Sequence, residues 1–178
     1  MRQLTLLRHA QAEPQSGEGH DIDRALSLHG RNQAGALGAL LHTEDAAPHL
    51  VLCSAANRAV QTWKLLAAGL AGAGGQDGTG IECRQLEELY GAGPTELLDL
   101  VRQVPAETTS VLVIGHEPVI SHVASILAGP RSQPAATAQV RAGMSTAMAA
   151  FLRTESPWSE LARGQATLTG LIRPDVKS

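Results

Sequence analysis

The chain of 178 residues has few aromatic side chains: two Trp, one Tyr and one Phe, together 2% of the sequence. A stacking platform for single-stranded nucleic acid is therefore not expected, because such surfaces combine several aromatic rings with a basic groove. The formal charge of −3 also argues against a nucleic-acid or anionic-membrane surface, since both need an excess of Lys and Arg. We expect no nucleic-acid partner and no membrane partner.

Cysteine is also scarce. Cys53 and Cys83 are too few for a disulfide framework and form no C-x-x-C motif, so both are interpreted as small buried thiols. No apolar run approaches the roughly 18 residues of a membrane-spanning helix, and no signal-peptide pattern opens the chain. These absences favour a cytoplasmic protein.

The length and the apolar fraction of 43% fit one domain, residues 1–178, with a substantial core. The apolar periodicity predicts strands at 3–7, 49–54, 81–89 and 109–115 and helices at 30–42, 57–70, 94–104 and 119–129. Two late strands, expected at sheet edges, follow at 145–153 and 165–172. Alternating strands and helices indicate an α/β fold: a three-layer α/β/α sandwich whose mostly parallel central sheet has helices on both faces.

Some local details are also predicted. The segment 109–115 is the strongest predicted strand of the chain, so we expect a central strand covered on both faces. Ser54 or Asn57 is expected to cap the helix at 57–70. The glycine-rich stretch 72–80 lacks the Lys-Ser/Thr of a phosphate-binding loop and is interpreted as a surface linker.

Polar residues follow three of the predicted strands. Arg8-His9 follows the first, the segment 54–58 (Ser54 to Arg58) the second, and His116-Glu117 the most apolar strand. Ligands of open α/β sheets bind beyond the carboxyl ends of the strands. We therefore expect these two arginines and two histidines to converge on one crevice.

That combination of residue types points to phosphoryl transfer. Arg forks match phosphate oxygens, and Arg8 and Arg58 would repel each other in one pocket without an anion between them. A neutral histidine ring nitrogen can attack phosphorus, and a second, protonated histidine can stabilise the transferring group. The set predicts a phosphohistidine intermediate without a metal. Either histidine alone would more simply be a buried structural residue; the ordered set argues otherwise.

Several segments resemble the histidine phosphatase superfamily with its phosphoglycerate-mutase-like fold. They are LLRHAQA (6–12), DIDRALSLHGRNQA (21–34), SAANRAVQT (54–62), LEELYGAGPTELLDLV (86–101), VIGHEP (113–118) and MSTAMAAFL (144–152). Ala10 stands where mutase-type members carry Gly, so the sequence most resembles the SixA-type phosphohistidine phosphatases. One departure is that the second motif lacks the extra basic residue or proline that usually precedes its arginine.

The resemblance implies residue roles. His9 resembles the nucleophile that becomes phosphorylated, Arg8 and Arg58 resemble the phosphate clamps, and His116 resembles the second pocket histidine. The family's general acid follows the third strand in a Leu-x-Glu context, which Glu88 fits. Glu87, which precedes Glu88, and Glu117, which follows His116, are alternative candidates for the acid. A site without any general acid is the remaining possibility.

The resulting functional prediction is a metal-independent phosphatase without cofactors that removes phosphate from phosphohistidine on a protein and releases inorganic phosphate. Imidazole leaves with little help from an acid, and the short connection after Glu88 forms no lid, which suits a phosphate displayed on a protein. A broad-specificity small-molecule phosphomonoesterase is the alternative, and a non-catalytic phosphoprotein-binding module is less favoured.

Metal binding and the first long loop were also considered. His116 and His122 are six residues apart, which does not fit helical zinc ligation, and the dyad His20-Asp21 lacks further ligands. Arg24 has two interpretations, a rim residue that touches substrate or a structural ion-pair partner.

Overall fold

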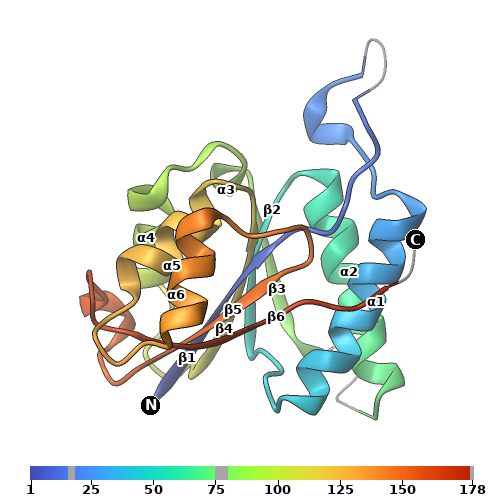
Figure 1. The fold of residues 1–178 in the computed structure, drawn as a ribbon. Coiled ribbons are helices and arrows are strands. Elements are labelled where there is room, and N and C mark those ends of the chain that lie inside the picture. The colour runs from blue at the N-terminus through green and yellow to red at the C-terminus, as the bar shows by residue number, and fades with distance from the viewer. Residues whose placement is uncertain (16–18, 75–79, 177–178) are drawn as a thin grey trace.

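The structure, a computed structural model, describes residues 1–15, 19–74 and 80–176. In these residues a six-stranded sheet runs in the order β3-β2-β4-β1-β5-β6 (Figure 1). The strands are β1 (Arg2–Arg8), β2 (Leu50–Ser54), β3 (Glu82–Leu86), β4 (Ser110–Gly115), β5 (Ala149–Thr154) and β6 (Thr167–Ile172). β1, β4, β2 and β3 pair in parallel, whereas β5 pairs antiparallel with both β1 and β6.

Helices cover both faces of this sheet (Figure 1). They are α1 (Leu28–Thr43), α2 (Asn57–Gly72), α3 (Glu88–Gly91), α4 (Pro94–Arg102), α5 (Val119–Leu127) and α6 (Pro134–Ala142), with 3-10 turns η1 (Asp21–Asp23) and η3 (Trp158–Glu160). α1 and α2 pack together on one face, and α4, α5 and α6 lie on the other.

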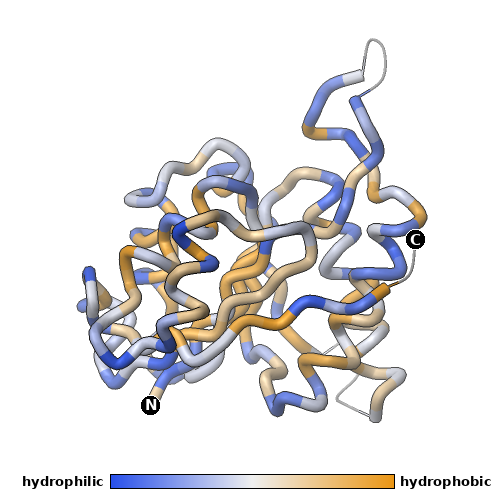
Figure 2. Tube along the Cα trace, in the orientation of Figure 1, coloured by the Kyte–Doolittle hydropathy of each residue, from blue (hydrophilic) through white to orange (hydrophobic). Residues whose placement is uncertain are grey.

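Strand β4 shows how the sequence produces the three layers. Its side chains alternate between faces: Val111 and Val113 join the core beneath α4, α5 and α6, while Leu112 and Ile114 join the core beneath α1 and α2. A strand buried on both faces needs apolar residues at every position, which is why this segment is the most apolar of the chain. The predicted sandwich is confirmed. Figure 2 shows the same pattern, with hydrophobic residues along the strands and hydrophilic ones along the loop before α1.

Several local predictions were wrong. β5 lies between β1 and β6, so only one of the two late strands is at an edge. Helix α6 is missing from the prediction because only Ala136 and Val140 of it are buried, which leaves no helical apolar stripe to detect. The segment after β3 forms the helix α3 rather than a loop, and α4 ends at Arg102, two residues before the predicted end.

Two other details differ. The N-cap of α2 is Ala56, with no side-chain capping bond, rather than Ser54 or Asn57. Cys53 is buried as expected, but Cys83, on the edge strand β3, is only half-buried. Most of the predicted glycine-rich linker, residues 75–79, lies outside the described residues.

Helices α1 and α2 approach each other closely through glycines. A Cβ atom at Gly38 would overlap the backbone carbonyl of Leu66, and one at Gly69 would overlap the carbonyl of Gly35. The close crossing of the two helices therefore depends on residues without side chains.

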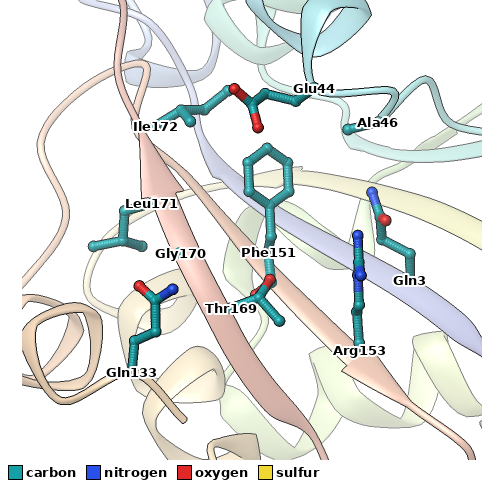
Figure 3. A pocket seen from close by; sticks show the side chains of 10 residues that line it. All are labelled: Gln3, Glu44, Ala46, Gln133, Phe151, Arg153, Thr169, Gly170, Leu171 and Ile172. Atoms are coloured by element: carbon teal, nitrogen blue, oxygen red, sulfur yellow. The ribbon is translucent and has the colours of Figure 1, made fainter.

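A hollow of about 490 Å³ lies where the sheet extends beyond α1, toward the amino end of β1 (Figure 3). The ring of Phe151 projects into it from β5 in the direction of Glu44. This hollow contains none of the predicted site residues. Among the helices of the described residues, none has the length and apolar character needed to cross a membrane.

Candidate active site

The carboxyl ends of three adjacent parallel strands bring the predicted residues together. Arg8 is the last residue of β1 and His9 follows it, Arg58 lies in the first turn of α2 after β2, and His116 directly follows β4. They line one cavity of about 310 Å³. The complete lining is Arg8, His9, Gln11, Ala12, Arg24, Arg58, His116, Glu117 and Thr146. The two arginines and two histidines therefore converge on one cavity at the carboxyl ends of the strands, as the sequence predicts.

The hydrogen bonds of His9 define its tautomer. Its Nδ1 lies 2.7 Å from the carbonyl oxygen of Ala10, and its Nε2 lies 3.2 Å from Nε of Arg58. A carbonyl only accepts and a guanidinium only donates, so the proton is on Nδ1 and the lone pair is on Nε2. Burial, with smaller effects of neighbouring groups such as Arg58, lowers the pKa of His9 to about 3, while the hydrogen bond to Ala10 acts in the opposite direction. At neutral pH this ring is uncharged, and His9 lines the cavity.

His116 lies beside His9, with the two ring centroids 5.1 Å apart. Its Nδ1 is 3.4 Å from a terminal nitrogen of Arg58, and its Nε2 is 2.8 Å from the hydroxyl oxygen of Ser54. Burial, with a smaller effect of Arg58, lowers its pKa to about 4, while the Asp21 carboxylate acts in the opposite direction. His116 is therefore neutral in the anion-free site, and a bound anion would favour its protonation.

Arg58 is 5% exposed, and the anion beside it is Asp21. One terminal nitrogen donates to the Asp21 carbonyl oxygen at 2.7 Å and the other to its Oδ2 at 3.0 Å. Tyr90 donates its hydroxyl proton to the same Oδ2 at 2.8 Å, and Arg24 forms an ion pair with Oδ1 at 2.9 Å. These contacts lower the pKa of Asp21, the Tyr90 hydrogen bond most strongly.

Asp21 and Tyr90 are the residues that sequence reasoning missed. Asp21 was weighed only as a metal ligand, and Tyr90 not at all. Nothing in the spacing links residues of η1 and α3 to the start of α2, because they meet only in the folded chain. Arg24 forms an ion pair with Asp21, which confirms one of its two interpretations; it also lines the cavity, and its contact with substrate stays a prediction.

The side chain of Arg8 is held in place by a main-chain carbonyl group. One of its terminal nitrogens donates to the carbonyl oxygen of Met144 at 2.7 Å. Glu117 in turn accepts from the backbone nitrogen of Met144 at 3.2 Å and from the Ser121 hydroxyl at 2.6 Å. The Nε atoms of Arg8 and Arg24 are buried and have no hydrogen-bond partner among the described residues. Because Arg8 and Arg24 both line the cavity, it is suited to an anionic ligand.

The three candidate acids differ in their surroundings. Glu87 and Glu88 are both exposed at the beginning of α3, and neither lines the cavity. Glu117 does line it, but both of its oxygens accept hydrogen bonds. In the described parts of the chain, no three His, Cys, Asp or Glu side chains are grouped to hold a metal ion. The predicted dyad partner Asp21 is paired with arginines instead.

Comparisons with known proteins agree with this architecture. The sequence model of the histidine phosphatase superfamily (branch 1) matches residues 4–89. The uncharacterized protein Rv1276c of Mycobacterium tuberculosis is 33% identical over 169 residues, which cover 94% of this chain and 99% of that protein. The structure of a SixA-type protein from Nakamurella multipartitia has a TM-score of 0.79 at 32% identity and covers 98% of this chain and 97% of its own.

More distant structures share the fold. The protein histidine phosphatase SixA in complex with tungstate has a TM-score of 0.70 at 20% identity, with 96% of both chains covered. The mycobacterial glucosyl-3-phosphoglycerate phosphatase Rv2419c has a TM-score of 0.62 at 20% identity, with 94% of this chain and 98% of that one covered.

The fold and the strand-end cluster thus define a phosphatase with a phosphoglycerate-mutase-like α/β architecture. Within that class, the chain belongs to the histidine phosphatase superfamily and is of the SixA type.

Proposed function

We propose that this phosphatase acts without a metal, through a phosphohistidine intermediate on His9, and that its substrate is phosphohistidine on a protein. Nε2 of His9 attacks phosphorus, and the bond to the leaving group breaks with its electron pair going to that group. Water then attacks the phosphorylated His9, releases inorganic phosphate and returns the electron pair to Nε2. The single observation that carries this proposal is the neutral His9, which lines the cavity and has its lone pair on Nε2, beside Arg58.

Positive charge for the phosphoryl group comes from three arginines. Arg58 and Arg8 border His9 and His116, and Arg24 lines the same cavity. The guanidinium groups of these residues are matched to phosphate oxygens. Preorganised donors of this kind stabilise charge in the transition state and supply the role that a metal ion fills in other phosphatases.

The carboxylates favour a leaving group that needs little protonation. An alkoxide is a poor leaving group and requires a positioned acid, whereas an imidazole nitrogen leaves readily. Glu117 is the one candidate acid lining the cavity in the described residues, and its two oxygens are engaged by Met144 and Ser121. This arrangement suits a phosphorus–nitrogen bond better than an alkyl phosphate.

The surroundings of the cavity favour a large substrate. A second hollow of about 530 Å³ shares Arg8 and Glu117 with the first and runs between the first turn of α5 and the end of α6. His122 and Arg141 on its walls are both exposed. A phosphorylated protein can fill this hollow with its own polypeptide while its phosphate enters beside His9.

The test compares turnover of a phosphohistidine-bearing protein, para-nitrophenyl phosphate and a panel of sugar phosphates, all in EDTA. Wild type and His9→Ala are run side by side, and a radiolabelled phosphoenzyme is trapped by rapid quenching at alkaline pH. We expect phosphohistidine turnover to dominate, and both turnover and label to vanish in His9→Ala. Preferred hydrolysis of a sugar phosphate would instead establish the small-molecule phosphomonoesterase. Activity lost in EDTA and restored by a divalent metal would refute metal independence.

A further inference from the structure

The carboxylate of Asp21 contacts two arginines that line the phosphate cavity, Arg24 and Arg58. Along the guanidinium of Arg58, Nε faces the buried His9, while a terminal nitrogen faces Asp21. The Asp21 side chain is 34% exposed, whereas His9 is 8% exposed. A nucleophile and a leaving group stand on opposite sides of phosphorus during an in-line displacement. A leaving group expelled by the buried His9 therefore moves away from that ring, toward the more exposed side of the site to which the Arg24–Asp21 pair belongs.

Three donors fix this carboxylate in one orientation. Oδ2 accepts from Arg58 and from the Tyr90 hydroxyl, and Oδ1 pairs with Arg24. Each carboxylate oxygen has two acceptor positions, so Oδ1 retains the capacity for one more hydrogen bond. The same contacts lower the pKa of Asp21, which keeps it ionised. Asp21 is therefore an acceptor and cannot serve as the acid that an alkyl phosphate needs.

A phosphorylated imidazole presents a donor that such an acceptor can use. When the ring is protonated, phosphorus is on one nitrogen and a proton is on the other. Attack by His9 breaks the phosphorus–nitrogen bond, and its electron pair goes to the nitrogen that carried phosphorus. The product is a neutral imidazole that keeps its proton on the distal nitrogen. The step balances without a general acid, provided that the ring is protonated when attacked.

We propose that Asp21 determines specificity by accepting a hydrogen bond from the distal N–H of the substrate's phosphohistidine ring, so that the protonated, readily displaced form is the one bound. The inference rests on the phosphohistidine substrate proposed above. The ionised carboxylate also disfavours leaving groups that become anionic, such as phenolates, because like charges repel in a partly buried site.

The test replaces Asp21 by Asn, which keeps a carbonyl oxygen for Arg58 and Tyr90 but removes the charge. Asp23→Asn is the matched control, because Asp23 is exposed in the same 3-10 turn and its side chain forms no ion pair among the described residues. The kcat/KM values for phosphohistidine and para-nitrophenyl phosphate are measured for each protein. Tyr90→Phe, which removes one of the donors holding Asp21, is a second variant.

For Asp21→Asn we expect kcat/KM for phosphohistidine to fall roughly 10- to 100-fold, the value of one charge-assisted hydrogen bond. The value for para-nitrophenyl phosphate should not fall in step, so the ratio of the two drops at least about tenfold. Tyr90→Phe should shift the ratio in the same direction by less, and Asp23→Asn should leave it unchanged.

Parallel loss of both activities in Asp21→Asn, with an unchanged ratio, would overturn the inference and show that Asp21 only positions Arg58. That result would leave the proposed function standing. A wild type that hydrolyses para-nitrophenyl phosphate through His9 but not phosphohistidine would overturn the proposed substrate together with this inference.

Discussion

The buried His9 should make the stability of the folded chain depend on pH. Its pKa falls from 6.5 to about 3 because burial disfavours the charged ring. Below pH 6.5 the unfolded chain binds a proton that the folded chain does not, so the free energy of unfolding decreases as the pH falls toward 3. Above that range both states are neutral and the full stability is present. Linkage gives a loss of about 2 kcal/mol from His9 alone between pH 8 and pH 5.

The measurement is urea unfolding at pH 8, 7, 6 and 5 in buffers without phosphate, for wild type, His9→Asn and His42→Gln. Each protein is compared with itself at pH 8, so the packing change at position 9 cancels. The loss between pH 8 and pH 5 should be about 2 kcal/mol smaller in His9→Asn than in wild type. His42 is exposed on α1, so its replacement should leave the loss as in wild type. An equal loss in wild type and His9→Asn would refute the placement of His9 as a neutral, buried ring.

Three further outcomes are expected. Gly38→Ala should lower the free energy of unfolding by about 1–3 kcal/mol, because the new methyl group overlaps the backbone of α2. Gly35→Ala in the same helix, with open space around its Cβ position, should raise it by about 0.5–1 kcal/mol in the same urea titration. Glu117→Ala should cost about 1–3 kcal/mol, because it leaves the Met144 N–H unpaired while the Ser121 hydroxyl keeps the Pro118 carbonyl as acceptor. It should also raise the inhibition constant of inorganic phosphate, because Arg8 is held by Met144; intact phosphate inhibition would contradict this. Glu88→Gln should change phosphohistidine turnover far less than the 10²–10⁴-fold that loss of a general acid gives, and a loss of that size would identify it as the acid.

Much of the architecture could be predicted because the signals are local. The run 111–115 is apolar at every position and fully buried, as a strand covered on both faces requires. The position of β5 could not be predicted, because an apolar segment does not show which strands will flank it. Helix α6 was missed because its two buried residues leave too weak a stripe.

The site residues could likewise be predicted where their sequence signal is local, but their contacts could not. Arg8, His9, Arg58 and His116 were found because each follows a strand directly, and parallel strands end at one edge of the sheet. The tautomer of His9 was not accessible from sequence, since it depends on the distances to Ala10 and Arg58. Glu117 could be named as a candidate acid, but only its contacts with Met144 and Ser121 show that its oxygens are occupied.

The sequence by itself determined the layered sheet, the family resemblance and the four residues at its strand ends, because periodicity and strand-end chemistry depend on neighbours along the chain. Only the tertiary structure decided which carboxylate meets Arg58. Asp21 and Tyr90 come from a turn and a short helix 69 residues apart, and they meet at 2.8 Å. Contacts between segments so distant leave no periodic trace, since they are created by packing around the folded sheet.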